Sequence, residues 1–210
     1  MGGLFIVVEG PDGAGKSTLA RWLATRLLAE GRRVVTVREP GGTPVAEAAR
    51  KVALRFPHAM APAAELFLML AARADLVERV IRPAVAAGRV VVADRFDLST
   101  MAYQVAGAGL PRAAVEATNR VATGGLVPDL TLVLDVPLST GRERQRRTRK
   151  IRDRFERRDD AFHQRVLQAY REAEGPGIVH LDASQSKLAV QEAAWREIIA
   201  SSAPTNRGVL

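Results

Sequence analysis

The chain has 210 residues, of which 47% are hydrophobic and 26% charged, a composition typical of one globular domain. Its longest apolar run, residues 66–72, is too short for the roughly 20 residues of a membrane helix, and no signal-peptide pattern is visible, so we expect a cytoplasmic protein with no membrane role. The lack of cysteine excludes disulfides, thiol catalysis, thiolate zinc sites and iron–sulfur clusters, while a net charge of +8 suggests a polyanionic partner: nucleic acid, a phospholipid surface or nucleotide phosphates.

Short apolar runs alternate with helical patterns along the chain, which predicts an α/β fold whose parallel sheet is covered on both faces. The expected strands are residues 4–9, 33–37, 90–93, 130–136 and 177–181. The expected helices are residues 16–30, 45–54, 63–87 with a bend or interruption near Pro83, 97–106, 111–123, 139–170 and 187–200. In such folds the ligand lies at the carboxyl ends of the strands.

The first expected strand leads into a glycine-rich loop that fits the P-loop pattern G-x-x-x-x-G-K-S between a strand and a helix. Backbone N–H groups of such a loop and the positive end of the following helix hold phosphates. We expect Lys16 at the β- and γ-phosphates of ATP and Ser17 as a Mg²⁺ ligand. The predicted ATP-binding residues are Gly10, Pro11, Asp12, Gly13, Ala14, Gly15, Lys16, Ser17 and Thr18.

The P-loop also contains an acidic residue, Asp12. Because phosphates repel the Asp12 carboxylate, we expect it to face a hydroxyl of a second substrate or the water around Mg²⁺, with a turn-forming role as the alternative.

Charged residues also follow the later strands. Asp94 is expected to bind Mg²⁺ through water and Arg95 to hold an additional phosphate, unless the two form a structural salt bridge. Arg38 follows the second strand in the same way. Two arginines beside a phosphate cradle favour phosphoryl transfer from one nucleotide to another.

The long helix over residues 63–87 carries Arg73 beside its apolar face. A buried guanidinium needs a partner, and a ligand carbonyl would serve, with Met69 one turn earlier packing on a flat ring. The alternative is an arginine at the helix edge that extends to water. Further along, Gln104 offers a donor and an acceptor, as recognition of a base edge requires.

Together these segments resemble the thymidylate kinase family. The matching stretches are FIVVEGPDGAGKST (5–18), REPGGT (38–43), AAR (71–73), DRFDLSTMAYQ (94–104), PDLTLVLDV (128–136), DRFE (153–156) and LDASQ (181–185). The resemblance implies the P-loop NTPase fold of nucleoside monophosphate kinases, a five-stranded parallel sheet with a mobile, arginine-rich lid. It also implies the Mg²⁺-dependent reaction of ATP with dTMP to give ADP and dTDP for dTTP synthesis, and a homodimer. We expect one domain over residues 1–203, a lid at about 142–158 and a tail over 204–210.

The resemblance also implies a role for each matching site residue. Arg38 and Arg95 would hold the dTMP phosphate, Asp12 would meet the sugar 3′-hydroxyl and the magnesium surroundings, Arg73 would bond a thymine carbonyl, Ser99 and Gln104 would contact the base, and Tyr103 would crowd the 2′ position. Met69 occupies the position at which the family usually stacks a phenylalanine on thymine. The residues predicted to be catalytic are Asp12, Lys16, Arg95 and Arg154.

The lid is expected to supply a positive charge for catalysis. Some relatives carry an arginine in the P-loop at the position of Gly13, and this chain does not. Ten basic residues lie between 142 and 158, too many charges for a core helix. We expect Arg154 to reach the ATP phosphates, with Arg147 and Arg149 as the next candidates. A solvated helix face or a nucleic-acid patch is the alternative.

Three other functions stay open at this point. The nearest is a kinase for another nucleoside monophosphate or for a deoxynucleoside, against which the thymine and deoxyribose contacts expected of Arg73, Tyr103 and Gln104 argue. A second is a nucleotide-dependent switch or a nucleic-acid-binding P-loop ATPase, which the net charge would suit. A third is a P-loop module without activity. We expect small-molecule nucleotides as partners and no nucleic acid.

Overall fold

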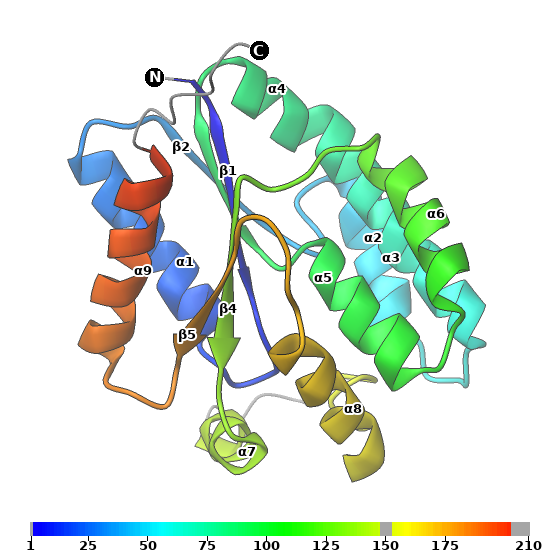
Figure 1. Cartoon of the computed structure of the whole chain (residues 1–210). Helices are drawn as coiled ribbons and strands as arrows, with labels where there is room; N and C mark the ends of the chain where they lie inside the picture. Colours follow the sequence, from blue (N-terminus) through cyan, green and yellow to red (C-terminus); the bar gives the residue numbers. More distant parts are fainter. Residues whose placement is uncertain (1, 148–152, 203–210) are drawn as a thin grey trace.

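The fold is built on a five-stranded parallel sheet, shown in Figure 1. The computed structural model describes residues 2–147 and 153–202. The strands are β1 (Leu4–Glu9), β2 (Val34–Arg38), β3 (Val90–Asp94), β4 (Leu130–Asp135) and β5 (Ile178–Asp182), in the order β2-β3-β1-β4-β5. Neighbouring strands pair in parallel throughout. The five predicted strands and the parallel α/β sheet are confirmed, with strand ends within one residue of the prediction.

The central strand β1 supplies apolar side chains to both faces of the sheet, as the alternation of side chains along a strand requires. Ile6 and Val8 belong to a core under α1 (Lys16–Ala29) and α9 (Lys187–Ser202). Phe5 and Val7 belong to a second core on the other face. Figure 1 shows α1 and α9 on one side of the sheet and α2 (Pro44–Arg55), α3 (Pro62–Leu76), α4 (Arg82–Ala86) and α6 (Arg112–Thr123) on the other.

The interruption predicted near Pro83 is confirmed, and it takes the form of a wider helical turn. The π-helix η1 (Val77–Ile81) separates α3 from α4. Proline has no N–H, and its ring collides with the carbonyl four residues back, which here is that of Arg79. The π-helix ends just before this position, and the Arg82 N–H donates to the Val77 carbonyl five residues back. A second π-helix, η2 (Met101–Gly107), follows the short α5 (Asp97–Thr100) in the predicted helix 97–106.

The prediction of continuous helix over residues 139–170 is wrong. Residues 138–147 form α7, and α8 spans Asp160–Arg171, with a turn between Asp153 and Asp159. The Asp159 carboxylate accepts a hydrogen bond from the Phe162 N–H at 2.7 Å and so caps a new helix. Part of the expected lid, residues 148–152, and the expected tail, residues 204–210, lie outside the described residues.

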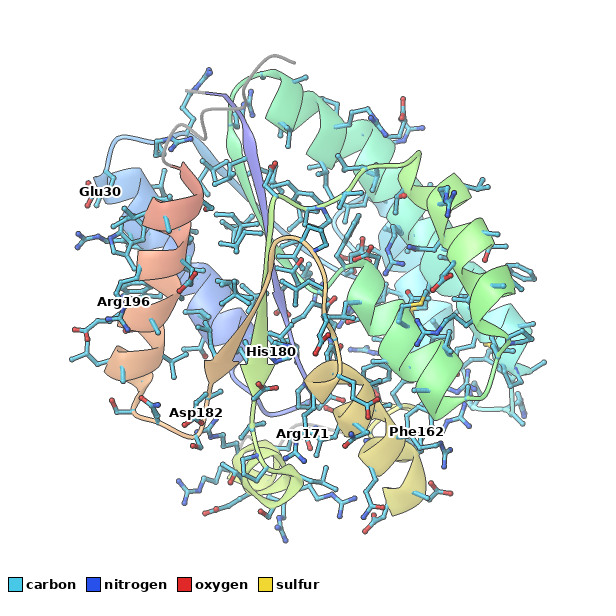
Figure 2. The ribbon with its side chains drawn as sticks, viewed as in Figure 1. Glu30, Phe162, Arg171, His180, Asp182 and Arg196 are labelled. Atoms are coloured by element: carbon cyan, nitrogen blue, oxygen red, sulfur yellow. The ribbon has the colours of Figure 1, made fainter. Side chains whose placement is uncertain are left out.

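One histidine joins the end of the sheet to the segment after α8. His180 on β5 places Nδ1 2.8 Å from Asp135 Oδ2 and Nε2 2.8 Å from the Ala173 carbonyl oxygen, and Figure 2 labels it between the sheet and α8. Burial lowers the pKa of His180, but the hydrogen bonds to Ala173 and Asp135 outweigh burial, and the net pKa is raised above its ordinary value near 6.5. Both ring nitrogens face acceptors, so the imidazolium fits this site better than the neutral ring.

This arrangement predicts a pH-dependent contribution to stability. Since the folded state raises the pKa of His180, the contribution is fully present below pH 6.5 and is lost as the pH rises through the folded-state pKa. Urea unfolding of the His180→Gln variant should therefore show a flatter decrease of the unfolding free energy between pH 6 and 8 than the wild type. His58→Gln, at an exposed position, should keep the wild-type slope. Equal slopes for wild type and His180→Gln would contradict the prediction.

Candidate active site

A cavity of about 530 Å³ opens at the carboxyl ends of the central strands, where parallel sheets bind their ligands. Its walls come from the P-loop, the loop after β2, α2, α3, the end of β3, α5, η2, α7 and residues 153–156. Fourteen of the predicted site residues line it: Asp12, Gly13, Gly15, Lys16, Ser17, Thr18, Arg38, Met69, Arg73, Asp94, Arg95, Ser99, Tyr103 and Gln104. Residues far apart in sequence thus meet at one site, as predicted.

Two P-loop glycines are required by close backbone contacts. Gly10 (φ 134°) approaches the Leu134 carbonyl, which a Cβ would meet at 2.7 Å. Gly13 (φ 79°) approaches the start of α7 so closely that a Cβ would lie 2.1 Å from the Gly141 carbonyl oxygen. Both glycines also adopt the left-handed conformation that side chains disfavour. The P-loop is therefore fixed between β4 and α7.

The lysine and serine of the P-loop are each held by a hydrogen bond within the site. Lys16 is buried, and its Nζ donates to the Pro11 carbonyl oxygen at 2.8 Å. Burial, followed by the nearby Arg95, lowers the pKa of Lys16 to about 8. The Ser17 hydroxyl donates to Asp94 Oδ2. This hydroxyl and carboxylate are hard oxygen donors of the kind Mg²⁺ prefers, so the predicted metal residues fit the ion.

Arg95 lies at the centre of the site with a strained backbone (φ 76°). Its guanidinium contacts Asp12, Ser99 Oγ at 3.2 Å, the Tyr103 hydroxyl at 3.2 Å and the Tyr170 hydroxyl at 3.1 Å. Burial raises the pKa of Asp12, but the charges of Arg95 and Lys16 and the Tyr103 hydroxyl outweigh burial, and the net pKa is lowered. Asp12 is therefore an ionised partner of Arg95, which the sequence argument did not foresee.

Glu9 holds the Arg95 loop in place, and the sequence analysis missed it. This fully buried carboxylate accepts hydrogen bonds from the Phe96 N–H at 2.7 Å, the Ser99 hydroxyl at 2.7 Å and the Tyr170 hydroxyl at 3.0 Å. Burial raises the pKa of Glu9. An acidic residue at the end of an apolar strand was the available signal, because such a charge needs partners when buried.

The chain itself supplies partners for Arg73. Its guanidinium donates to Glu39 at 2.8 Å, Asn119 at 2.6 Å, Thr100 at 2.8 Å and the Phe96 carbonyl at 2.8 Å. Because the side chain is 3% exposed, the alternative of an arginine that extends to water is wrong. The expectation that a buried guanidinium has partners is confirmed, and residues of the chain itself fill that role. Arg73 still lines the cavity, and its contact with thymine stays a prediction.

The residues predicted to contact the base and the sugar line the same cavity. The Tyr103 hydroxyl donates to Asp12 Oδ2 at 2.9 Å, and the Ser99 hydroxyl is held by Glu9. Gln104 is buried and donates from Nε2 to Glu65 Oε1 at 3.3 Å. Met69 packs in the cluster that contains Tyr103 and lines the cavity.

The arginines expected at the phosphates lie in different surroundings. Arg38 is 55% exposed and pairs with Glu47 at 3.1 Å, at the edge of the cavity. Arg154 does not line the cavity; its Nη1 approaches the Ala53 carbonyl at 3.5 Å and its Nη2 approaches Glu65 at 3.8 Å. Arg147 pairs with Glu143 at 2.6 Å, and Arg149 lies outside the described residues. Arg144, which sequence reasoning missed, lines the cavity.

A second cavity of about 280 Å³ adjoins the other side of the P-loop. Its walls include Ala14, Thr18, Arg144, Ala183 and Gln185. The Arg144 guanidinium donates to the Ala183 carbonyl oxygen at 3.0 Å. Since Arg144 and the P-loop border both cavities, the two cavities meet at the loop.

A P-loop at the carboxyl edge of this parallel sheet, in one cavity with Arg38, Arg73 and Arg95, is the arrangement of a nucleoside monophosphate kinase. The sequence model described as thymidylate kinase matches residues 8–194. The chain belongs to the thymidylate kinase family.

Similar curated proteins carry the same name. A thymidylate kinase of Idiomarina loihiensis is 44% identical over 201 residues, 94% of this chain and 98% of that protein. One from Cereibacter sphaeroides is 49% identical over 91% of this chain and 92% of its own length, and one from Pseudomonas entomophila is 47% identical over 92% and 93%. Among the described residues, no helix has both the length and the apolar character needed to span a membrane.

Proposed function

We propose that this protein transfers the γ-phosphoryl group of ATP to the phosphate of dTMP, giving ADP and dTDP for dTTP synthesis. The observation that carries the proposal is a single cavity that joins Lys16 and Ser17 of the P-loop to Arg95, Tyr103 and Gln104. The P-loop suits a triphosphate, and the other residues suit the phosphate, sugar and base of an acceptor nucleotide.

The reaction requires alignment and charge neutralisation more than proton transfer. The acceptor phosphate has a second pKa of about 6, so it is mostly dianionic at neutral pH and needs no general base. Lys16 and Arg95 offset the repulsion between the two anions and place them in line. Mg²⁺, held by Ser17 and through water by Asp94, would add positive charge at the phosphates when bound.

Each substrate has its own set of residues in this proposal. ATP would place its phosphates on residues 10–18 and its adenine in the second cavity, near residues 183–185. dTMP would occupy the first cavity, with its phosphate at Arg38 and Arg95. The Arg38 side chain is exposed, so it can leave Glu47 at little cost. The residues proposed to contact the sugar and base are Asp12, Met69, Arg73, Ser99, Tyr103 and Gln104.

One assay tests the function. Purified protein receives ATP and Mg²⁺ with dTMP, dUMP, dCMP or thymidine, or with no acceptor, and ADP and the phosphorylated product are measured. We expect dTDP to form with dTMP and little ADP without an acceptor. Phosphorylation of thymidine instead would identify a deoxynucleoside kinase. ADP formed without an acceptor and increased by DNA would identify a nucleic-acid-dependent ATPase, and either outcome would reject the proposal.

Two residues, Arg144 and Arg154, are candidates for the arginine that stabilises the transferring phosphoryl group, and the kcat of alanine variants can distinguish them. Arg144→Ala should lower kcat by about 100-fold, because Arg144 borders both cavities at the P-loop and can stabilise the transferring phosphoryl group. Arg154→Ala should lower it by less than about tenfold. Arg146→Ala, at an exposed position on the same helix, is the matched control. A larger loss for Arg154→Ala than for Arg144→Ala would support the sequence-based assignment of Arg154 and contradict this one.

We also propose Mg²⁺ as the cofactor, a cytoplasmic location and a homodimer. The Ser17–Asp94 pair supports the metal. Exposed apolar side chains on three helices support self-association: Val45 and Val52 on α2, Phe67 on α3 and Val121 on α6. Because α3 packs against both α2 and α6, these helices form one side of the molecule, as Figure 1 shows.

A further inference from the structure

A buried carboxylate outside the predicted site connects the base end of the cavity to the turn after α7. Glu65 on α3 is fully buried. Its Oε1 accepts from Gln104 Nε2 at 3.3 Å, and its Oε2 lies 3.2 Å from Arg158 and 3.8 Å from Arg154. The two arginines offset the cost of burying this charge. The contact with Gln104 is the one that reaches the cavity.

Glu65 determines which end of the Gln104 amide faces the cavity. A carboxylate accepts hydrogen bonds and cannot donate them, so Gln104 must turn its NH₂ group toward Glu65. The reverse orientation would place two acceptor oxygens together and leave both unpaired, which is costly in a buried site. Gln104 Oε1 therefore points away from Glu65.

The Gln104 side-chain oxygen, Oε1, is available to accept a hydrogen bond from a ligand. Gln104 lines the cavity, and none of the described residues donates a hydrogen bond to its Oε1. In the described part of the chain, the buried side-chain polar atoms that lack a partner are Glu39 Oε1 and Asp135 Oδ1. Gln104 Oε1 is not among these enclosed atoms, so it is accessible from the cavity as an acceptor.

We propose that Glu65 is a positioning residue for base selection, an inference that rests on the proposed dTMP kinase function. Thymine presents one donor, N3–H, between two carbonyl groups, whereas N3 of cytosine is an acceptor. Gln104 Oε1 held toward the cavity pairs with N3–H of thymine and repels N3 of cytosine. Uracil has the same edge as thymine, so Glu65 selects against cytosine nucleotides and not against dUMP.

The test compares kcat/KM for dTMP with kcat/KM for dCMP in wild type and Glu65→Gln. A glutamine at position 65 can offer either an oxygen or an NH₂ group to Gln104, so the amide is no longer held in one orientation. We expect the dTMP-to-dCMP ratio to fall at least about tenfold. An unchanged ratio overturns the inference. Wild-type protein that does not phosphorylate dTMP would instead reject the proposed function, and this is measured first.

Two further variants test whether Glu65 acts by orienting the Gln104 amide or whether its replacement disturbs the site in general. Arg158→Gln removes a charge partner of Glu65 and leaves the hydrogen bond to Gln104, so the ratio should stay near that of wild type; an equal fall would overturn the inference. Introducing Glu65→Gln into Gln104→Met should change the ratio no further, because the oriented amide is already gone. A further tenfold change would show that Glu65 acts by another route.

The conservative variant Glu65→Asp keeps the proposal testable if Glu65→Gln does not fold, which thermal unfolding would reveal. Aspartate retains the charge for Arg154 and Arg158 but withdraws one methylene from Gln104. The ratio should fall here as well, and an unchanged ratio in a folded Glu65→Asp protein overturns the inference.

Discussion

Replacing Lys16 with alanine is expected to lower kcat for phosphoryl transfer by at least about 1000-fold. Lys16 begins α1 immediately after Gly15, and its buried ammonium group lies beside the loop that would hold the β- and γ-phosphates. Burial, followed by the nearby Arg95, lowers its pKa to about 8, and a bound phosphate would favour the charged form. Removal of the side chain would take a fixed positive charge away from the proposed site of phosphoryl transfer.

The measurement is kcat with saturating ATP and dTMP, accompanied by thermal unfolding to confirm that Lys16→Ala is folded. Lys51→Ala, an exposed lysine on α2, is the matched control and should keep wild-type turnover. Substantial activity in a folded Lys16→Ala protein would mean that the P-loop does not hold the donor phosphates.

Arg95→Lys is expected to lower kcat/KM for dTMP by about 100-fold or more, with a smaller effect on the KM for ATP. The guanidinium contacts Asp12 and the hydroxyls of Ser99, Tyr103 and Tyr170 at once. A lysine keeps the charge but offers a single ammonium group, so it cannot hold these partners and a phosphate together. Both side chains carry a Cβ, so the backbone strain at φ 76° is equal and the comparison isolates the head group.

Steady-state kinetics with each substrate varied in turn would check this result. Arg196→Lys is a suitable control because Arg196 is exposed on α9, away from the cavity, where Figure 2 labels it. An Arg95→Lys enzyme with normal kcat/KM for dTMP would remove Arg95 from acceptor binding.

The sheet and the P-loop could be predicted because their signals are local. An apolar run such as residues 4–9 is a strand within its own length, and the glycines and Lys16 are contiguous in sequence. The meeting of Asp94 with Ser17 could also be predicted, because the carboxyl ends of parallel strands share one edge of the sheet. These features depend on short segments and on one general rule of topology.

Other features depend on contacts that no local pattern contains. The partners of Arg73 come from three other segments, one of them 46 residues away at Asn119. Glu65 is an ordinary acidic residue in the sequence, and only the fold shows that it is buried. The helix break before α8 was missed because the high charge of residues 139–170 obscured the capping signal of Asp159. Arg144 and Arg154 belong to the same basic stretch of the sequence. In the structure, Arg144 lines the cavity, whereas Arg154 contacts Ala53 and Glu65.

The contact between Gly13 and Gly141 has a consequence for exchanging parts between relatives. A side chain at position 13 would collide with the first turn of α7, since even its Cβ would lie 2.1 Å from the Gly141 carbonyl oxygen. A single substitution that places an arginine here would therefore force the backbone near Gly141 to move. We therefore expect the P-loop and α7 to be matched to each other, so that a hybrid of two relatives should take both segments from the same parent.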